Sequence, residues 1–65
     1  MMFSQGNRVK LRVDVGRLGA NLVRAGTEGA VTKVENDTVH VVFDGGDAWQ
    51  FAGSTAYDSL EFAAV

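Results

Sequence analysis

The chain has 65 residues, a mass of 6.9 kDa and a formal net charge of −2. This length gives room for one domain, residues 1–65, with a core near the lower limit for unaided folding. The absence of cysteine excludes disulfides and thiolate metal sites. With 46% hydrophobic and 22% charged residues, the chain is too apolar for a disordered segment. No uncharged run is long enough to span a membrane, and no signal-peptide pattern opens the chain, so we expect a cytoplasmic protein without membrane contact.

Strict alternation of apolar and basic residues predicts a first strand over 7–14. Val9, Leu11 and Val13 fall on one face of this strand, which we expect to point into the core. The opposite face carries a basic row of Arg8, Lys10 and Arg12.

Three further strands follow over 29–35, 38–43 and 48–51. The pairs Asn36-Asp37 and Gly45-Gly46 are suited to the tight turns of two hairpins, because these residues tolerate positive φ. Val31 and Val34 are three residues apart, so either the second strand has a bulge or only one of them faces the core. On the third strand His40 and Val42 should face away from the core, which makes Val42 a candidate interface residue.

Two connections complete the predicted fold. Glycines interrupt the helical spacing of Leu18, Leu22 and Val23, so residues between Asp14 and Glu28 are expected to form a long loop with at most one helical turn. A short 3₁₀ turn over 54–58, capped by serine, is predicted before a last strand over 60–62. Five short strands in this order usually close into a small barrel.

This order of elements resembles the SH3-like small barrels over nearly the whole chain. The segments GNRVKLRV and GTEGAVTKV are also similar to the KOW pattern G-x-x-G-x-V-x-x-V, matched by Gly26, Gly29, Val31 and Val34. The same features are similar to accessory subunits, namely the small stromal subunit of photosystem I, the variable chain of ferredoxin-thioredoxin reductase and the barrel of the nitrile hydratase β subunit. That resemblance implies a barrel that packs against a larger partner and carries no catalytic residue.

Charge is divided unevenly along the chain. Residues 1–33 hold all six basic residues and two acids, a formal +4, whereas residues 34–65 hold six acids and no base, a formal −6. One interpretation is that the basic row pairs with Glu61 and other cross-strand acids. The other, which the KOW resemblance implies, is a phosphate-binding surface, although the net charge and a pI near 5.0 oppose nucleic-acid affinity. The residues of that surface are Arg8, Lys10, Arg12, Arg24 and Lys33.

Aromatic residues divide into core and rim candidates. We expect Phe43 and Phe51 in the hydrophobic core, because a small barrel needs large apolar side chains there. Trp49 and Tyr57 each have a polar group at the end of the ring, so we expect them to be partly buried at the edge of the core. Large apolar residues in the long loop, such as Leu22, either cover the open end of the barrel or meet another protein.

Catalytic chemistry has little support in the residues. His40 is the only imidazole, and no serine, histidine and acid have the spacing of a nucleophile with its base. The stretch from Asp44 to Asp47 lacks the regular oxygen ligands of a calcium loop, so a hairpin turn explains it better. We therefore expect no enzyme, no catalytic residue, no metal, no cofactor and no small-molecule substrate.

The sequence thus predicts an all-β, five-stranded SH3-like barrel that binds a larger protein or a second copy of itself. In SH3-like barrels the first long loop and the region before the 3₁₀ turn border one groove, so the resemblance implies a partner site there. Its residues would be Arg17, Leu18, Leu22, Arg24, Trp49 and Tyr57. Binding of RNA or DNA through the basic residues is the alternative function.

Overall fold

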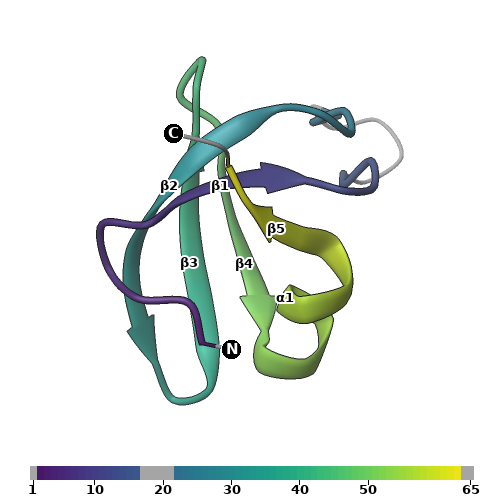
Figure 1. The fold of residues 1–65 in the computed structure, drawn as a ribbon. Coiled ribbons are helices and arrows are strands. Elements are labelled where there is room, and N and C mark those ends of the chain that lie inside the picture. The colour runs from purple at the N-terminus through teal and green to yellow at the C-terminus, as the bar shows by residue number, and fades with distance from the viewer. Residues whose placement is uncertain (1, 17–21, 64–65) are drawn as a thin grey trace.

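The computed structural model describes residues 2–16 and 22–63. Its strands are β1 (Arg8–Leu11), β2 (Glu28–Glu35), β3 (Thr38–Phe43), β4 (Ala48–Ala52) and β5 (Leu60–Phe62), and a helix, α1 (Gly53–Ser59), precedes β5. All neighbouring strands are antiparallel, and their order in the sheet is β4-β3-β2-β1-β5. The sheet curls around its inner face (Figure 1), which gives a small all-β, barrel-like fold compatible with an SH3-like barrel.

Two tight turns join β2, β3 and β4, as the sequence predicts. Asn36 and Asp37 have φ values of 51° and 58°, and Gly45 and Gly46 have φ values of 102° and 99°. Positive φ at both residues of the two-residue turn Asn36-Asp37 matches the right-handed twist of the flanking strands, whereas the second connection spans residues 44–46 and is closed by a hydrogen bond from the N–H of Gly46 to the carbonyl of Phe43. The stretch from Asp44 to Asp47 is therefore a hairpin turn, as expected.

A bulge in β2 accounts for the uneven spacing of its valines. The register with β3 shifts between Val31, which pairs with Val41, and Lys33, which pairs with His40. The extra residue turns Val34 back toward the inner side of the sheet, where it pairs with the buried Val39. The bulge also bends β2, which pairs with β1 on one side and with β3 on the other as the sheet curls (Figure 1).

The first strand is shorter than predicted, and the expectation that Val13 faces the core is wrong. Strand β1 ends at Leu11, and Val13 is 44% exposed. The physical reason is that β1 has no partner strand beyond Leu11 among the described residues. Leu11 pairs with Leu60, which is the first residue of β5, and the residues before Leu60 form α1 and not a strand. Beyond Leu11 the chain leaves the sheet.

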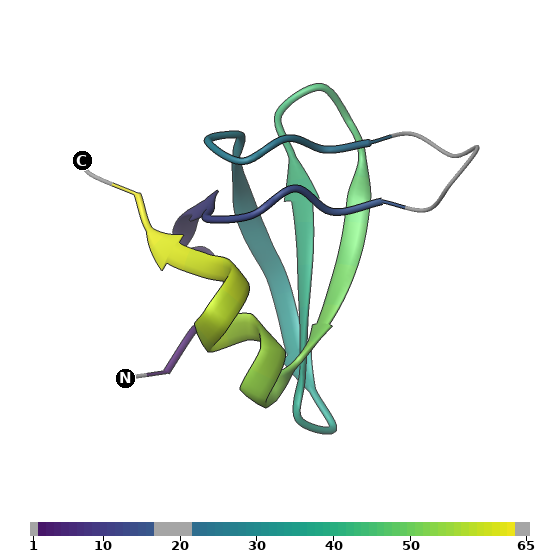
Figure 2. The same ribbon diagram turned by 90° about the vertical axis from the view of Figure 1, so that its right-hand side faces the viewer.

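The two described arms of the long loop lie side by side. Val15 and Val23 form an antiparallel bridge, with main-chain hydrogen bonds of 2.8 Å in both directions. Figure 2 shows the arms crossing the barrel together. Val23 is buried against the core while Leu22 is 53% exposed, so the loop covers the barrel with one of these residues only.

The predicted 3₁₀ turn over 54–58 is wrong, because the chain forms a seven-residue α-helix from Gly53 to Ser59. Serine does not cap it: the N-cap is Ala52, without a side-chain hydrogen bond. Burial explains the longer helix, since Ala56 is 1% exposed and Ser59 is also buried. Packing of this face on β3 and β4 adds stability that the local sequence does not contain.

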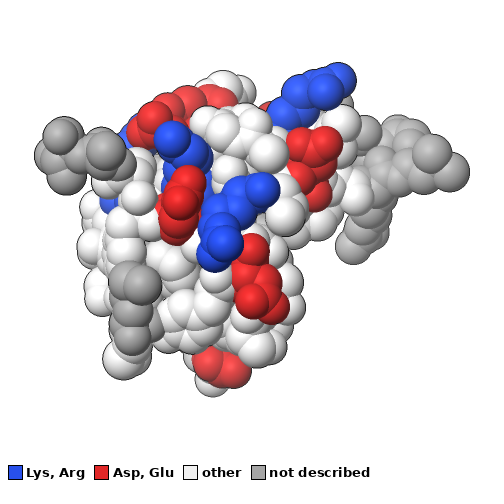
Figure 3. Space-filling model, turned by 45° about the vertical axis from the view of Figure 1, so that its right-hand side comes forward, with Lys and Arg blue, Asp and Glu red and all other residues white. Residues whose placement is uncertain are grey.

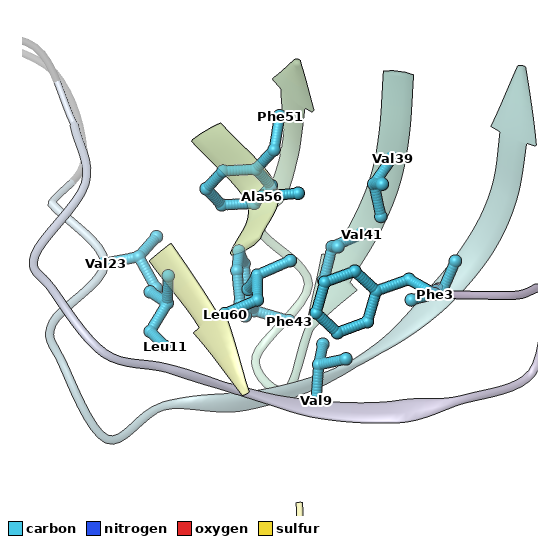
Figure 4. Close-up of a cluster of buried hydrophobic side chains, with 11 residues drawn as sticks. Phe3, Val9, Leu11, Val23, Val39, Val41, Phe43, Phe51, Ala56 and Leu60 are labelled. Carbon is cyan, nitrogen blue, oxygen red and sulfur yellow. The ribbon is translucent and has the colours of Figure 1, made fainter. Parts of the chain in front are cut away.

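The core fills the concave side of the sheet (Figure 4). Phe43 and Phe51 are each 2% exposed and meet edge to face at 6.4 Å between ring centroids, which confirms both as core residues. Trp49 is partly buried against this cluster, also as expected. The other buried members are Phe3, Val9, Leu11, Val23, Val31, Val39, Val41, Ala56 and Leu60.

Candidate partner-binding surface

Three aromatic rings from distant parts of the chain meet at one side of the core. The ring of Phe3 stacks on Tyr57 with a centroid distance of 5.7 Å and an angle of 28°, and meets Phe62 at 4.9 Å and 44°. Phe3 is buried, whereas Tyr57 and Phe62 are 46% and 40% exposed. This group, called the aromatic cluster below, joins the N-terminal segment to α1 and β5.

Apolar side chains extend the aromatic cluster along the surface. Met2 is 77% exposed and Val34 is 43% exposed, and both line a hollow of about 70 Å³ together with Phe3 and Tyr57. Asp37, Val39 and Gly53 complete its lining. A surface that gathers exposed methionine, valine and aromatic side chains is typical of a protein-binding site.

A basic side chain borders the aromatic cluster. The guanidinium of Arg12 lies 3.5 Å from the main-chain carbonyl of Tyr57, to which it donates a hydrogen bond. Tyrosine beside arginine is a combination enriched where proteins bind one another, because both side chains combine apolar area with hydrogen-bonding groups.

Arg8, the first residue of the basic row, is held in a charge network. Its guanidinium donates to both carboxylate oxygens of Asp44, at 2.8 and 3.2 Å, and lies 3.7 Å from Glu28. The hydrogen bond from Arg8 lowers the pKa of the Asp44 carboxyl below its ordinary value of 3.8, and the same bond raises the pKa of Arg8. Arg8 therefore binds acids of its own chain, although the pairing is with Asp44 and Glu28 and not with Glu61.

Other basic residues of the nucleic-acid alternative also lie near acids. Lys10 pairs in register with Glu28 on one side and Glu61 on the other, and Lys33 lies 3.2 Å from Glu35. In Figure 3 basic and acidic side chains lie next to each other on the visible face. Arg24 is exposed and forms no ion pair with residues in the ranges 2–16 and 22–63.

The residues of the predicted partner site lie in several places. Arg17 and Leu18 fall outside the described residues. Leu22 and Arg24 are exposed on an arm of the loop, Trp49 lies on β4 and Tyr57 on α1. Trp49 and Tyr57 line different hollows. Sequence patterns pointed to Tyr57 but not to Met2, Phe3, Val34 or Phe62 as surface contacts, because the segment before β1 has no strand periodicity and Phe62 follows no pattern that distinguishes it.

A second, larger groove lies on the outer face of β3 and β4. Its volume is about 490 Å³, and its lining is Thr32, His40, Val41, Val42, Ala48, Trp49 and Gln50. Val42 is 40% exposed there and His40 is partly buried, which confirms that both face away from the core. The lining contains no acidic residue, lysine or arginine.

In the part of the chain that the structure describes, no three His, Cys, Asp or Glu side chains gather as metal ligands would. No helix among the described residues has the length and apolar character needed to cross a membrane. Comparison with protein-family models, curated proteins and solved structures finds no significant match to this chain.

Proposed function

We propose that this chain is a non-enzymatic, cytoplasmic protein-binding module that docks on a larger protein and also associates with itself. The observation that carries the docking role is the aromatic cluster with its apolar surroundings. A small barrel has little core to spare, yet Tyr57, Phe62, Val34 and Met2 all remain between 40% and 77% exposed on and around this cluster. Covering them with a partner would bury apolar area that the fold itself leaves in water.

The distribution of charge supports protein binding over nucleic-acid binding. Phosphate binding requires free cations, whereas Arg8 and Lys33 are already paired with carboxylates of the same chain. Each phosphate contact by these residues would first have to replace an existing ion pair. The resemblance to accessory subunits that pack on larger redox or catalytic proteins agrees with this role.

Capture from a lysate of the source cells, with and without nuclease, tests the proposal. The informative variant is Val34→Lys, which places a charge in the apolar surface at a side chain already 43% exposed. Val13→Lys is its matched control, because Val13 is 44% exposed and lies outside the lining of the hollow beside the aromatic cluster. We expect a discrete protein to be retained by the wild type and by Val13→Lys after nuclease treatment, and lost with Val34→Lys.

Two results would contradict the proposal. Retention that nuclease abolishes would favour nucleic-acid binding, and replacement of Arg12 and Arg24 by glutamine should then reduce the salt dependence of oligonucleotide affinity. Equal retention by Val34→Lys and Val13→Lys would exclude the aromatic cluster as the docking surface.

A further inference from the structure

Strand β4 is an edge of the sheet, because β3 is the only described strand that pairs with it. The N–H of Phe43 donates to the carbonyl of Asp47, and the N–H of Gly53 donates to the carbonyl of Asp37. Because hydrogen-bonded pairs alternate along an antiparallel ladder, Trp49 and Phe51 are the residues of β4 that bond to β3. The main-chain groups of Ala48 and Gln50 and the N–H of Ala52 consequently point away from β3, whereas the carbonyl of Ala52, the N-cap residue, accepts the first hydrogen bond of α1. None of the three forms a hydrogen bond across this edge with any described residue, and all three are exposed.

The other edge of the sheet is protected, and β4 is not. Strand β5 has only three residues, carries Glu61, and uses the N–H of Leu60 to close α1 on Ala56. Short length and charge are the devices that keep edge strands from pairing with another chain. Strand β4 has five residues, Ala-Trp-Gln-Phe-Ala, without charge, proline or register shift.

The sequence of β4 is symmetric in character about Gln50. Reading outward from Gln50, aromatic residues stand at Trp49 and Phe51 and alanines at Ala48 and Ala52. A two-fold axis at Gln50 would therefore place the exposed Ala48 opposite the exposed Ala52 of a second copy, whereas Trp49 and Phe51 lie on the inner side of each sheet, where Phe51 is buried in its own core. Such self-complementarity is what an interface between identical chains requires.

Charge favours the antiparallel arrangement of two copies. Asp47 precedes β4, and no acid follows it within α1 until Asp58. Antiparallel pairing sets each Asp47 opposite Gly53 of the other copy, whereas parallel pairing would bring the two carboxylates together. The outward residues of β3 and β4 are Thr38, His40, Val42, Ala48, Gln50 and Ala52, none of which is an acid, lysine or arginine.

We propose that two copies of this chain form a dimer by antiparallel pairing of β4 with β4 about a two-fold axis at Gln50, which joins the two sheets into one. The N–H of Gln50 in each copy donates to the carbonyl of Gln50 in the other, and the N–H of Ala52 in each copy donates to the carbonyl of Ala48 in the other. The exposed alanines let the strands approach closely, and the two outer-face grooves lie side by side across the axis. This inference specifies the self-association within the proposed function.

Sedimentation equilibrium over a range of concentrations tests the dimer, with Gln50→Lys as the variant and Gln5→Lys as its matched control. Both residues are exposed glutamines, so the two variants carry the same charge change. We expect the wild type and Gln5→Lys to reach twice the 6.9 kDa chain mass, and Gln50→Lys to stay monomeric with an unchanged circular dichroism spectrum. Two lysines facing each other across the axis should raise the dissociation constant by about tenfold or more.

Amide hydrogen exchange provides a readout that does not depend on a variant. In the dimer the N–H groups of Gln50 and Ala52 become protected, and dilution should restore their exchange. Those of Trp49 and Phe51 bond to β3 and stay protected at every concentration. A wild type that remains monomeric, a dimer unaffected by Gln50→Lys, or assemblies that grow beyond two chains would each overturn the proposal. None of these outcomes bears on docking through the aromatic cluster, which Val34→Lys tests separately.

Discussion

Asp37, in the turn between β2 and β3, packs directly against Gly53, the first residue of α1. The carbonyl of Asp37 accepts a hydrogen bond from the N–H of Gly53 at 2.7 Å. The carboxylate of Asp37 fills the space where a side chain on Gly53 would begin: a Cβ there would lie 2.8 Å from the carboxyl carbon. The contact places a negative charge at the N-terminus of a helix that has no acid in its own first turn.

The contact predicts a coupling between these two residues. Gly53→Ala should displace the carboxylate and lower the free energy of unfolding by about 1 kcal/mol. The cost stays moderate because the neighbouring atoms are the end of a flexible side chain. In an Asp37→Gly background, Gly53→Ala should cost much less, since the obstacle is gone. A double-mutant cycle by urea denaturation measures the coupling, and equal costs in both backgrounds would contradict it.

Gly29 should tolerate substitution far less than Gly53. A Cβ on Gly29 would lie 2.6 Å from the main-chain oxygen of Val42 and 2.8 Å from the Cα of Phe43, so the strand backbone itself would have to move. We expect Gly29→Ala to cost about 3 kcal/mol, enough to unfold a domain of this size to a large extent. Gly26→Ala, at a φ of 94° with open space around it, should cost about 1 kcal/mol from backbone strain alone. Thermal unfolding followed by circular dichroism tests this ranking, which would be wrong if Gly26→Ala were the more damaging.

Phe3 should contribute to stability as a core residue although it precedes the first strand. It is 6% exposed and touches two other rings, so Phe3→Ala should cost about 3 to 4 kcal/mol. Met2→Ala, at a side chain 77% exposed, should change the free energy of unfolding by less than about 0.5 kcal/mol. Chemical denaturation of the two variants makes the comparison. Similar small effects would show that the aromatic cluster does not stabilise the fold.

The Arg8–Asp44 pair predicts a loss of stability in acid. The pKa of Asp44 is lowered in the folded state by its hydrogen bond with Arg8, so the contribution of this pair is present above the ordinary value of 3.8. This contribution is lost as the pH falls from the ordinary value of 3.8 through the lower folded-state pKa. In that interval the unfolded chain binds a proton at Asp44 that the folded chain does not bind, so the acid favours unfolding. Both groups are exposed, and added salt should weaken the effect.

Denaturation midpoints measured from about pH 5 to about pH 2.5 test this dependence. Asp44→Asn should reduce the slope of stability against pH over this interval. Asp58→Asn is the control, because Asp58 is exposed and forms no ion pair among the described residues. An unchanged slope in Asp44→Asn would mean that the pair contributes nothing in solution.

Local sequence was sufficient to predict most of the sheet. The hairpins follow from Asn36-Asp37 and Gly45-Gly46, whose conformational preferences act within a few residues. The bounds of β3 and β5 agree with the prediction, and Phe43 and Phe51 are core residues as expected. Alternation along a strand is likewise a local property, so the inward direction of Val9 and Leu11 was visible in the sequence.

What the tertiary structure alone decided depends on contacts between distant residues. Strand β1 ends at Leu11 because its partner β5 begins only at Leu60, and α1 forms because the buried Ala56 packs on the sheet. Arg8 pairs with Asp44, which is 36 residues away, and Phe3 joins Tyr57 and Phe62 across almost the whole chain. The open edge of β4 also became visible only with the strand order. Local preferences predict where strands and turns form, but the curling of the sheet decides where β1 ends and which side chains meet.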